Sequence, residues 1–215
     1  MKKFVLIIFL VGFCNVFATF EFDILGNLTS STSFPMTESK ANKVNGSTEA
    51  IFGATLQLGN QFSMNNALKG VSIFAEVLVE QETIALTLPG DTKTVSKKTG
   101  LNLGAGLNTK FIFGSVNSLV PRDTILGFGL GAKILVNAPN VILSTSIPII
   151  TPYVDVFVEQ RFFVSRKLAL ICGLHIGMDM MIFQATDMGA LFNGLYVTAY
   201  PSMNIGLSIG LHFGH

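Results

Sequence analysis

Two short stretches of the sequence contain residue types that could do chemistry. The first, residues 124–135, reads TILGFGLGAKIL, in which three glycines alternate with apolar residues and a lysine follows. Phosphate-binding loops also combine glycine with lysine, but this G-x-G-x-G spacing differs from a dinucleotide loop and no helical period follows it. The second is the pair His175 and Asp179, four residues apart, which are too few groups for a metal site or a catalytic site. We therefore expect no enzyme activity, no cofactor and no metal ion.

The elements that position these residues are predicted to be β-strands. Eight segments alternate apolar and polar residues with a period of two, the pattern of strands with one apolar face and one polar face. The apolar face carries no charged residue in any of the eight. We expect strands at about 20–28, 50–62, 71–82, 100–113, 124–135, 152–162, 168–182 and 200–213. The three glycines of TILGFGLGAKIL then share the polar face of one strand.

The connections between these strands alternate in length. Those at about 29–49, 83–99, 136–151 and 183–199 are long, and those at about 63–70, 114–123 and 163–167 are short. An even number of strands joined by long loops at one end and short turns at the other is typical of outer-membrane barrels.

The composition agrees with a membrane protein that has no membrane helix. Hydrophobic residues make up 49% of the 215 residues and charged residues only 13%, yet no internal stretch reaches the roughly 20 apolar residues of a spanning helix. Residues 1–18 combine Lys2-Lys3, an apolar run and Val16-Phe17-Ala18, which offers small residues at the positions that signal peptidase reads, and this predicts a signal peptide cleaved after Ala18. Lipoprotein cleavage at Cys14 is disfavoured by the bulky residue before it. The nearly neutral mature chain gives no indication of nucleic-acid binding.

Alternation alone does not show which face points inward, because a lipocalin-type barrel buries its apolar face and a membrane barrel exposes it. Glycines crowd the polar face, and glycine within a strand is costly unless space is short, as in a narrow barrel interior. Phenylalanines cluster at the short-turn ends, as an aromatic girdle at a membrane interface would. These expected interface residues are Phe20, Phe22, Phe62, Phe111, Phe113, Phe162, Phe163 and Phe213. Tyr153, Phe183, Tyr196 and Tyr200 are expected near the other rim.

The last expected strand alternates apolar residues up to Phe213, similar to the C-terminal assembly signal of outer-membrane barrels, although Gly214 and His215 follow. With the signal peptide and eight strands, the chain resembles small bacterial outer-membrane proteins of the OmpA-barrel, OmpX and OmpW type, and small spirochaete barrels. The resemblance implies an eight-stranded antiparallel up-and-down transmembrane β-barrel over residues 19–215. It also implies contact with outer-membrane lipid and with the barrel-assembly machinery. It is architectural, so no functional residue is carried over.

The polar face of such a barrel carries a predicted lumen charge network: Glu21, Asp23, Glu76, Glu80, Lys110, Lys133, Asp155, Glu159, Arg161, His175 and Asp179. These groups could form an acidic conduit that prefers cations, or a packed core whose charges pair. Pairing is favoured because eight strands leave room for little more than side chains, and Phe74, Leu78, Phe157 and Ile171 also point inward.

The predicted function is therefore that of a structural or surface-interacting outer-membrane barrel with a side-chain-filled polar lumen. Two alternatives remain open: a narrow channel for small or hydrophobic solutes, similar to OmpW, and a soluble periplasmic lipocalin-like carrier. Binding to a surface ligand would involve the long loops. Lys93, Lys97 and Lys98 could attract acidic glycans or phosphates there, but the sequence does not identify a ligand.

Overall fold

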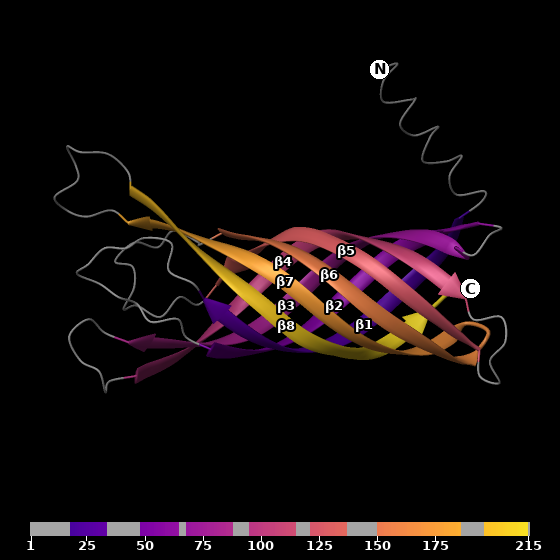
Figure 1. The fold of residues 1–215 in the computed structure, drawn as a ribbon, viewed down its shortest axis with the longest axis horizontal. Coiled ribbons are helices and arrows are strands. Elements are labelled where there is room, and N and C mark those ends of the chain that lie inside the picture. Colours follow the sequence, from indigo (N-terminus) through magenta and orange to yellow (C-terminus); the bar gives the residue numbers. More distant parts are fainter. Residues whose placement is uncertain are drawn as a thin grey trace, which may run out of the picture.

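The computed structural model describes residues 18–33, 48–64, 68–87, 95–114, 121–136, 150–185 and 196–214. They form eight strands: β1 (Ala18–Ser33), β2 (Thr48–Ser63), β3 (Gly70–Thr87), β4 (Val95–Gly114), β5 (Arg122–Leu135), β6 (Ile150–Ser165), β7 (Leu168–Ala185) and β8 (Tyr196–Phe213). Each strand pairs antiparallel with the next, and β1 pairs with β8 to close the barrel (Figure 1). The prediction of an all-β, eight-stranded, antiparallel up-and-down barrel is confirmed.

No helix in the described part of the chain is long and apolar enough to cross a membrane. The predicted signal peptide falls on residues 1–17, outside the described ranges, and on Ala18, where β1 begins.

The strands extend further toward the long loops than the alternation predicted. Pairing of β3 with β4 continues to Thr87 and Val95, whereas pairing of β2 with β3 stops at Ile51 and Glu82. The β7–β8 pair likewise continues beyond its neighbours (Figure 1). These two hairpins project from the barrel as two-stranded ribbons. A ribbon outside the membrane needs no continuous apolar face, so alternation did not mark its ends.

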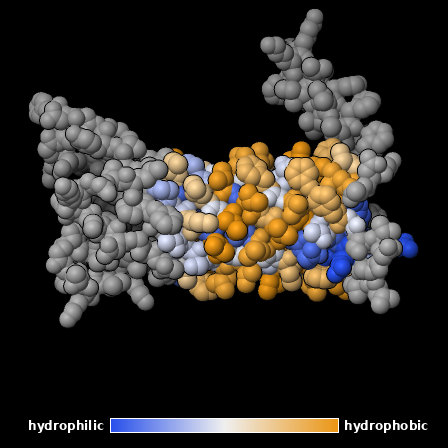
Figure 2. Space-filling view, in the orientation of Figure 1, coloured by the Kyte–Doolittle hydropathy of each residue, from blue (hydrophilic) through white to orange (hydrophobic). Residues whose placement is uncertain are grey.

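Apolar side chains face outward around the whole barrel. In β5, Phe128 is 43% exposed and Leu130 48% exposed, while Gly127 and Gly129, which alternate with them along the strand, are buried. Figure 2 shows hydrophobic residues over the middle of the barrel and hydrophilic residues near the short-turn end. A soluble lipocalin-like carrier requires the opposite arrangement, with the apolar face inside. That alternative is therefore wrong.

The glycines of TILGFGLGAKIL lie on the inner wall of β5, where larger side chains from β6 need the space. A Cβ atom at Gly127 would overlap the ring of Phe157, and one at Gly131 would overlap Tyr153 and the backbone of β4. Glycine is required at both positions because the lumen is already filled from the neighbouring strand.

Most of the expected interface phenylalanines lie on the outer surface near the short turns. Phe20, Phe111, Phe113, Phe162 and Phe213 are exposed, whereas Phe22 and Phe62 are partly covered. The rings of Phe22 and Phe213 pack together across the β1–β8 seam, with centroids 5.8 Å apart.

For two aromatic residues the structure corrects the expected placement. Phe163 follows the outward Phe162, so in an extended strand it must point inward. Its ring meets His212 edge-on at 6.3 Å inside the short-turn end of the barrel. Tyr153 was expected at the outer rim but shares the inward face of β6 with Phe157 and is buried. The side chains of Phe183, Tyr196 and Tyr200 lie outside the described part of the structure.

Candidate functional site in the barrel lumen

The half of the lumen nearest the short turns is filled by a cluster of charged side chains, which we call the ionic plug. It consists of Glu21, Asp23, Lys110, Glu159, Arg161 and His212. These residues come from β1, β4, β6 and β8, so the cluster spans the lumen rather than following one strand. Each is on the inner face because each shares its strand parity with buried neighbours.

Lys110 is the centre of the ionic plug. Its Nζ atom donates to Asp23 Oδ2 at 2.8 Å and to Glu159 Oε2 at 3.0 Å. Its ammonium group also lies over the ring of Phe74, 4.8 Å from the centroid, and 5.5 Å from that of Phe157. The side chain is 0% exposed. A fully buried lysine is stable only with such partners, and here it has two carboxylates and two aromatic faces.

Arg161 and His212 bind the same two acids of β1 from the other side. Arg161 donates to Asp23 Oδ2 at 3.1 Å and to Glu21 Oε1 at 3.4 Å. His212 Nδ1 lies 2.6 Å from Asp23 Oδ1. Ser72 of β3 donates its hydroxyl to Glu21 Oε2 at 2.8 Å. Glu21 and Asp23 are therefore each held by partners from more than one strand.

Apolar packing closes the space that the ionic plug leaves. Ile112, Ile125 and Phe157 form a buried cluster beside it. Ala169 and Ile171 of β7 are also completely buried. Charged and apolar side chains together leave little room for water in this half of the barrel.

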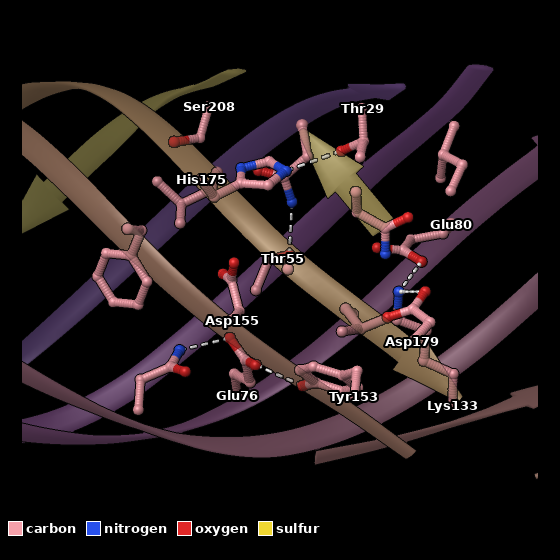
Figure 3. Close-up of a pocket in the computed structure, with 18 of the residues that line it drawn as sticks. Thr29, Thr55, Glu76, Glu80, Lys133, Tyr153, Asp155, His175, Asp179 and Ser208 are labelled. Carbon is pink, nitrogen blue, oxygen red and sulfur yellow. Dashed lines mark hydrogen bonds and ion pairs between the residues drawn. The ribbon is translucent and has the colours of Figure 1, made fainter. Parts of the chain in front are cut away.

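The half of the lumen toward the long loops is organised by two further groups. Lys133 of β5 pairs with Glu80 of β3 at 2.9 Å and with Asp179 of β7 at 3.0 Å. Glu76 accepts hydrogen bonds from the hydroxyl of Tyr153 and from the side-chain amides of Gln57 and Asn108. Figure 3 shows Lys133 beside Glu80 and Asp179, and Tyr153 reaching Glu76.

Between these groups lies a cavity of about 80 Å³. Its wall is mixed: the carboxylates named above, the amides of Asn27 and Asn204, and the apolar side chains of Leu25 and Leu78. His175 contributes a ring whose Nε2 lies 2.9 Å from Thr29 Oγ1. A polar cavity of this size has room for several water molecules or one small solute.

All the residues of the predicted charge network lie on the inner face, but the structure separates them into two sets. Glu21, Asp23, Lys110, Glu159 and Arg161 meet in the ionic plug, although Glu159 also reaches the cavity. The other set surrounds the cavity: Glu76, Glu80, Lys133, Asp155, His175 and Asp179. Within the described ranges, no three His, Cys, Asp or Glu side chains come together as a metal site would require.

Three inward groups were not among the predicted residues. His212 belongs to the ionic plug, Glu82 accepts a hydrogen bond from Asn102 at 2.8 Å, and Asp123 pairs with Lys69 at 2.9 Å near the short turns. Strand parity indicates the inward direction of all three, and for His212 the sequence already predicted it. Asp123 lies outside the predicted strand at 124–135, because β5 begins at Arg122, whereas Glu82 lies at the very end of the predicted strand at 71–82.

The sequence matches no protein-family profile and no curated protein. Among solved structures, outer-membrane protein AlkL in lipid bilayers is similar, with 11% identity over 92% of this chain and 90% of AlkL and a TM-score of 0.50. Neisserial surface protein A matches with 10% identity, 89% and 96% coverage and a TM-score of 0.42. Ail, the attachment invasion locus protein of Yersinia pestis, matches with 10% identity, 91% and 99% coverage and a TM-score of 0.36.

Proposed function

We propose that the protein is a non-conducting barrel that anchors its long loops at the cell surface. The proposal starts from the fold of a bacterial outer-membrane β-barrel, which eight strands, an apolar outer surface and similarity to AlkL support. The proposal includes export by residues 1–18, recognition of β8 by the barrel-assembly machinery, and a surface ligand bound by the loops. The observation that carries it is the ionic plug, which fills the short-turn half of the lumen with paired charges.

The energetics of the plug argue against passage of solutes. To open a path, a solute or ion would have to separate Lys110 from Asp23 and Glu159, or Arg161 from Glu21 and Asp23. Breaking one partner from a buried ion pair costs about 3–5 kcal/mol, and these pairs share acids so that several would break together. A rigid closed interior suits an anchor, because a rigid scaffold positions binding loops.

A narrow channel remains the second candidate, and the cavity in the outer half of the lumen is the observation that favours it. The cavity could be one stage of a path if the plug rearranged. We do not propose an enzyme, since most acids in the described part of the lumen are held in ion pairs or accept hydrogen bonds from side-chain amides.

Planar-bilayer recording separates the anchor from the channel. The purified wild-type protein should give no defined single-channel steps. The double variant Lys110→Ala/Glu159→Ala removes a cation and an acid together and leaves a water-filled gap in the plug. This variant should conduct, and its conductance would show that folded barrels have entered the bilayer.

The matched control is Lys69→Ala/Asp123→Ala, which removes a lysine–aspartate pair at the short-turn rim outside the plug. It should remain silent like the wild type. Reproducible wild-type steps of the same size as those of the plug variant would refute the non-conducting proposal and favour the channel.

A further inference from the structure

The cavity in the outer half of the lumen is rich in hydrogen-bond acceptors that have no donor. Gln57 is 3% exposed and Asn204 5% exposed, and both line the cavity. The side-chain oxygens of both, Gln57 Oε1 and Asn204 Oδ1, are buried without a hydrogen-bond partner in the described part of the chain. An unmade hydrogen bond of this kind is costly, so a donor is expected in the cavity.

The orientation of the Gln57 amide is determined by its neighbour. Its Nε2 donates to Glu76 Oε2 at 3.1 Å. Turning the amide over would place its oxygen against the carboxylate, which is unfavourable, so Oε1 must be the atom that faces the cavity. Exchanging the oxygen and nitrogen of the Gln57 amide therefore does not supply the missing donor.

A carboxylate completes the set of acceptors. Asp155 Oδ1 also lacks a hydrogen-bond partner among the described residues. Asp155 of β6 and Asn204 of β8 flank Gly177 of β7, which pairs with both of them. Because Gly177 has no side chain, a notch remains between the carboxylate and the carboxamide. A Cβ atom built there would lie 3.3 Å from Asp155 Oδ1 and 3.9 Å from Asn204 Cβ.

The formal charge of the cavity wall is strongly negative. Glu76, Glu80, Asp155 and Asp179 line it, and Lys133 is the lysine that faces them. Lys133 is shared between Glu80 and Asp179, and Glu76 is bound by neutral donors. The buried Oδ1 atom of Asp155 thus has neither a cation nor a donor from the described side chains, although a buried charged atom requires a partner.

We propose that this cavity is a binding site for a small organic ammonium ion, with the notch between Asp155 and Asn204 receiving the ammonium group. An ammonium ion supplies the positive charge and the N–H donors that the cavity wall lacks. The volume of about 80 Å³ suits a molecule of a few heavy atoms, and Leu25 and Leu78 provide apolar wall for its carbon atoms. A metal ion suits the site less well, because no three metal-binding side chains converge in the described ranges.

Methylammonium is the probe for the experiment. The folded protein in lipid nanodiscs is titrated with isotope-labelled methylammonium, and binding is followed by saturation-transfer NMR. The wild type should bind one methylammonium per barrel in a saturable manner, and saturation should reach it from the rings of Tyr153 and His175. Potassium or magnesium at equal concentration should not displace it.

Two variants test the notch. Asp155→Asn removes the charge and should weaken binding by about tenfold or more, because hydrogen bonds to charged groups are the strong ones. Gly177→Ala fills the notch without changing any charge and should weaken binding as well. Asp123→Asn makes the same chemical change at the far end of the barrel and should bind like the wild type. Heat-modifiable gel mobility confirms that each variant is folded.

Several outcomes would overturn the proposal. Absence of saturable binding to the wild type would mean that the lone acceptors are satisfied by water or by protons on the carboxyl groups. Equal displacement by potassium would indicate an unspecific cation site. Unchanged affinity in both folded variants would place the bound ion elsewhere. None of these results depends on whether the barrel conducts.

Discussion

At the scale of single residues, the lumen is held together by side chains that bridge strands which are not neighbours. Lys110 lies on β4, yet its partners Asp23 and Glu159 lie on β1 and β6. Such a bridge ties opposite walls of the barrel, whereas backbone pairing ties only adjacent strands. The charges of the plug should therefore contribute to the stability of the closed barrel.

The first prediction concerns the loss of the central cation. Lys110→Met keeps much of the side-chain volume but leaves Asp23 and Glu159 without their ammonium partner. We expect the free energy of unfolding to fall by about 3–5 kcal/mol, as when one member of a buried ion pair is removed. Urea unfolding in lipid vesicles, followed by the heat-modifiable mobility of the folded barrel, measures this change.

Lys69→Met is the control, since the Lys69 side chain is 51% exposed and pairs with Asp123 at the rim. Exposed pairs contribute at most about 1 kcal/mol. Equal losses in both variants would mean that the buried charges of the plug have no special role in stability.

The second prediction concerns the glycines of TILGFGLGAKIL. Gly127→Ala places a methyl group against the ring of Phe157, and overpacking of this kind typically costs about 1–3 kcal/mol. Gly26→Ala points outward, where the nearest atom is Ile209 O at 3.7 Å, and should be tolerated. The same unfolding assay compares the two. The double variant Gly127→Ala/Phe157→Leu should recover stability, and no recovery would contradict the packing explanation.

The sequence predicts which residues point into the lumen but not which ones meet. Alternation assigned Glu21, Asp23, Lys110 and Arg161 to the inner face because side-chain direction follows strand parity. Their pairing depends on the stagger of eight strands and on the curvature of the closed sheet, and alternation along one strand contains neither. Tyr153 was misplaced for a different reason, because its strand parity indicated the lumen but its residue type suggested the rim.

At the scale of the strands, each strand has an apolar outer face. A charged substitution on this face should cost more stability near the middle of the membrane than near its edge. Leu130 lies near the middle of β5 and is exposed, while Val164 lies at the short-turn end of β6 and is 66% exposed. Strand ends were predicted less well than strand centres. The projecting parts of β3, β4, β7 and β8 lie where no membrane requires an apolar face.

The third prediction follows from this difference in depth. Leu130→Arg should cost about 2–4 kcal/mol of stability in lipid vesicles, whereas Val164→Arg should cost about 0–1 kcal/mol. Urea unfolding of both variants in the same vesicles is the measurement. If the two substitutions cost the same in vesicles, these surfaces would not differ in membrane depth.

At the scale of the whole molecule, the barrel is apolar outside and polar inside, the reverse of a soluble protein. The sequence predicted this arrangement from the glycines on the polar faces, the phenylalanines at the short-turn ends and the last strand, which alternates up to Phe213. Alternation by itself was compatible with a soluble carrier as well. The claim that the apolar outer face lies in a membrane is central, because a lumen plug and surface loops have their proposed roles only there.

Cys172 tests that claim directly, since it is exposed on the outer face of β7 between Leu170 and Leu174. In a chain carrying Cys14→Ser, Cys172 is labelled with a fluorophore and the protein is inserted into lipid vesicles. The control chain carries Cys14→Ser and Cys172→Ser with Ser165→Cys, which places the label at the exposed short turn. We predict that bromines on the lipid chains quench the Cys172 label and that aqueous iodide does not, while iodide quenches the control. Iodide quenching of Cys172 equal to that of the control would contradict a membrane-embedded outer face.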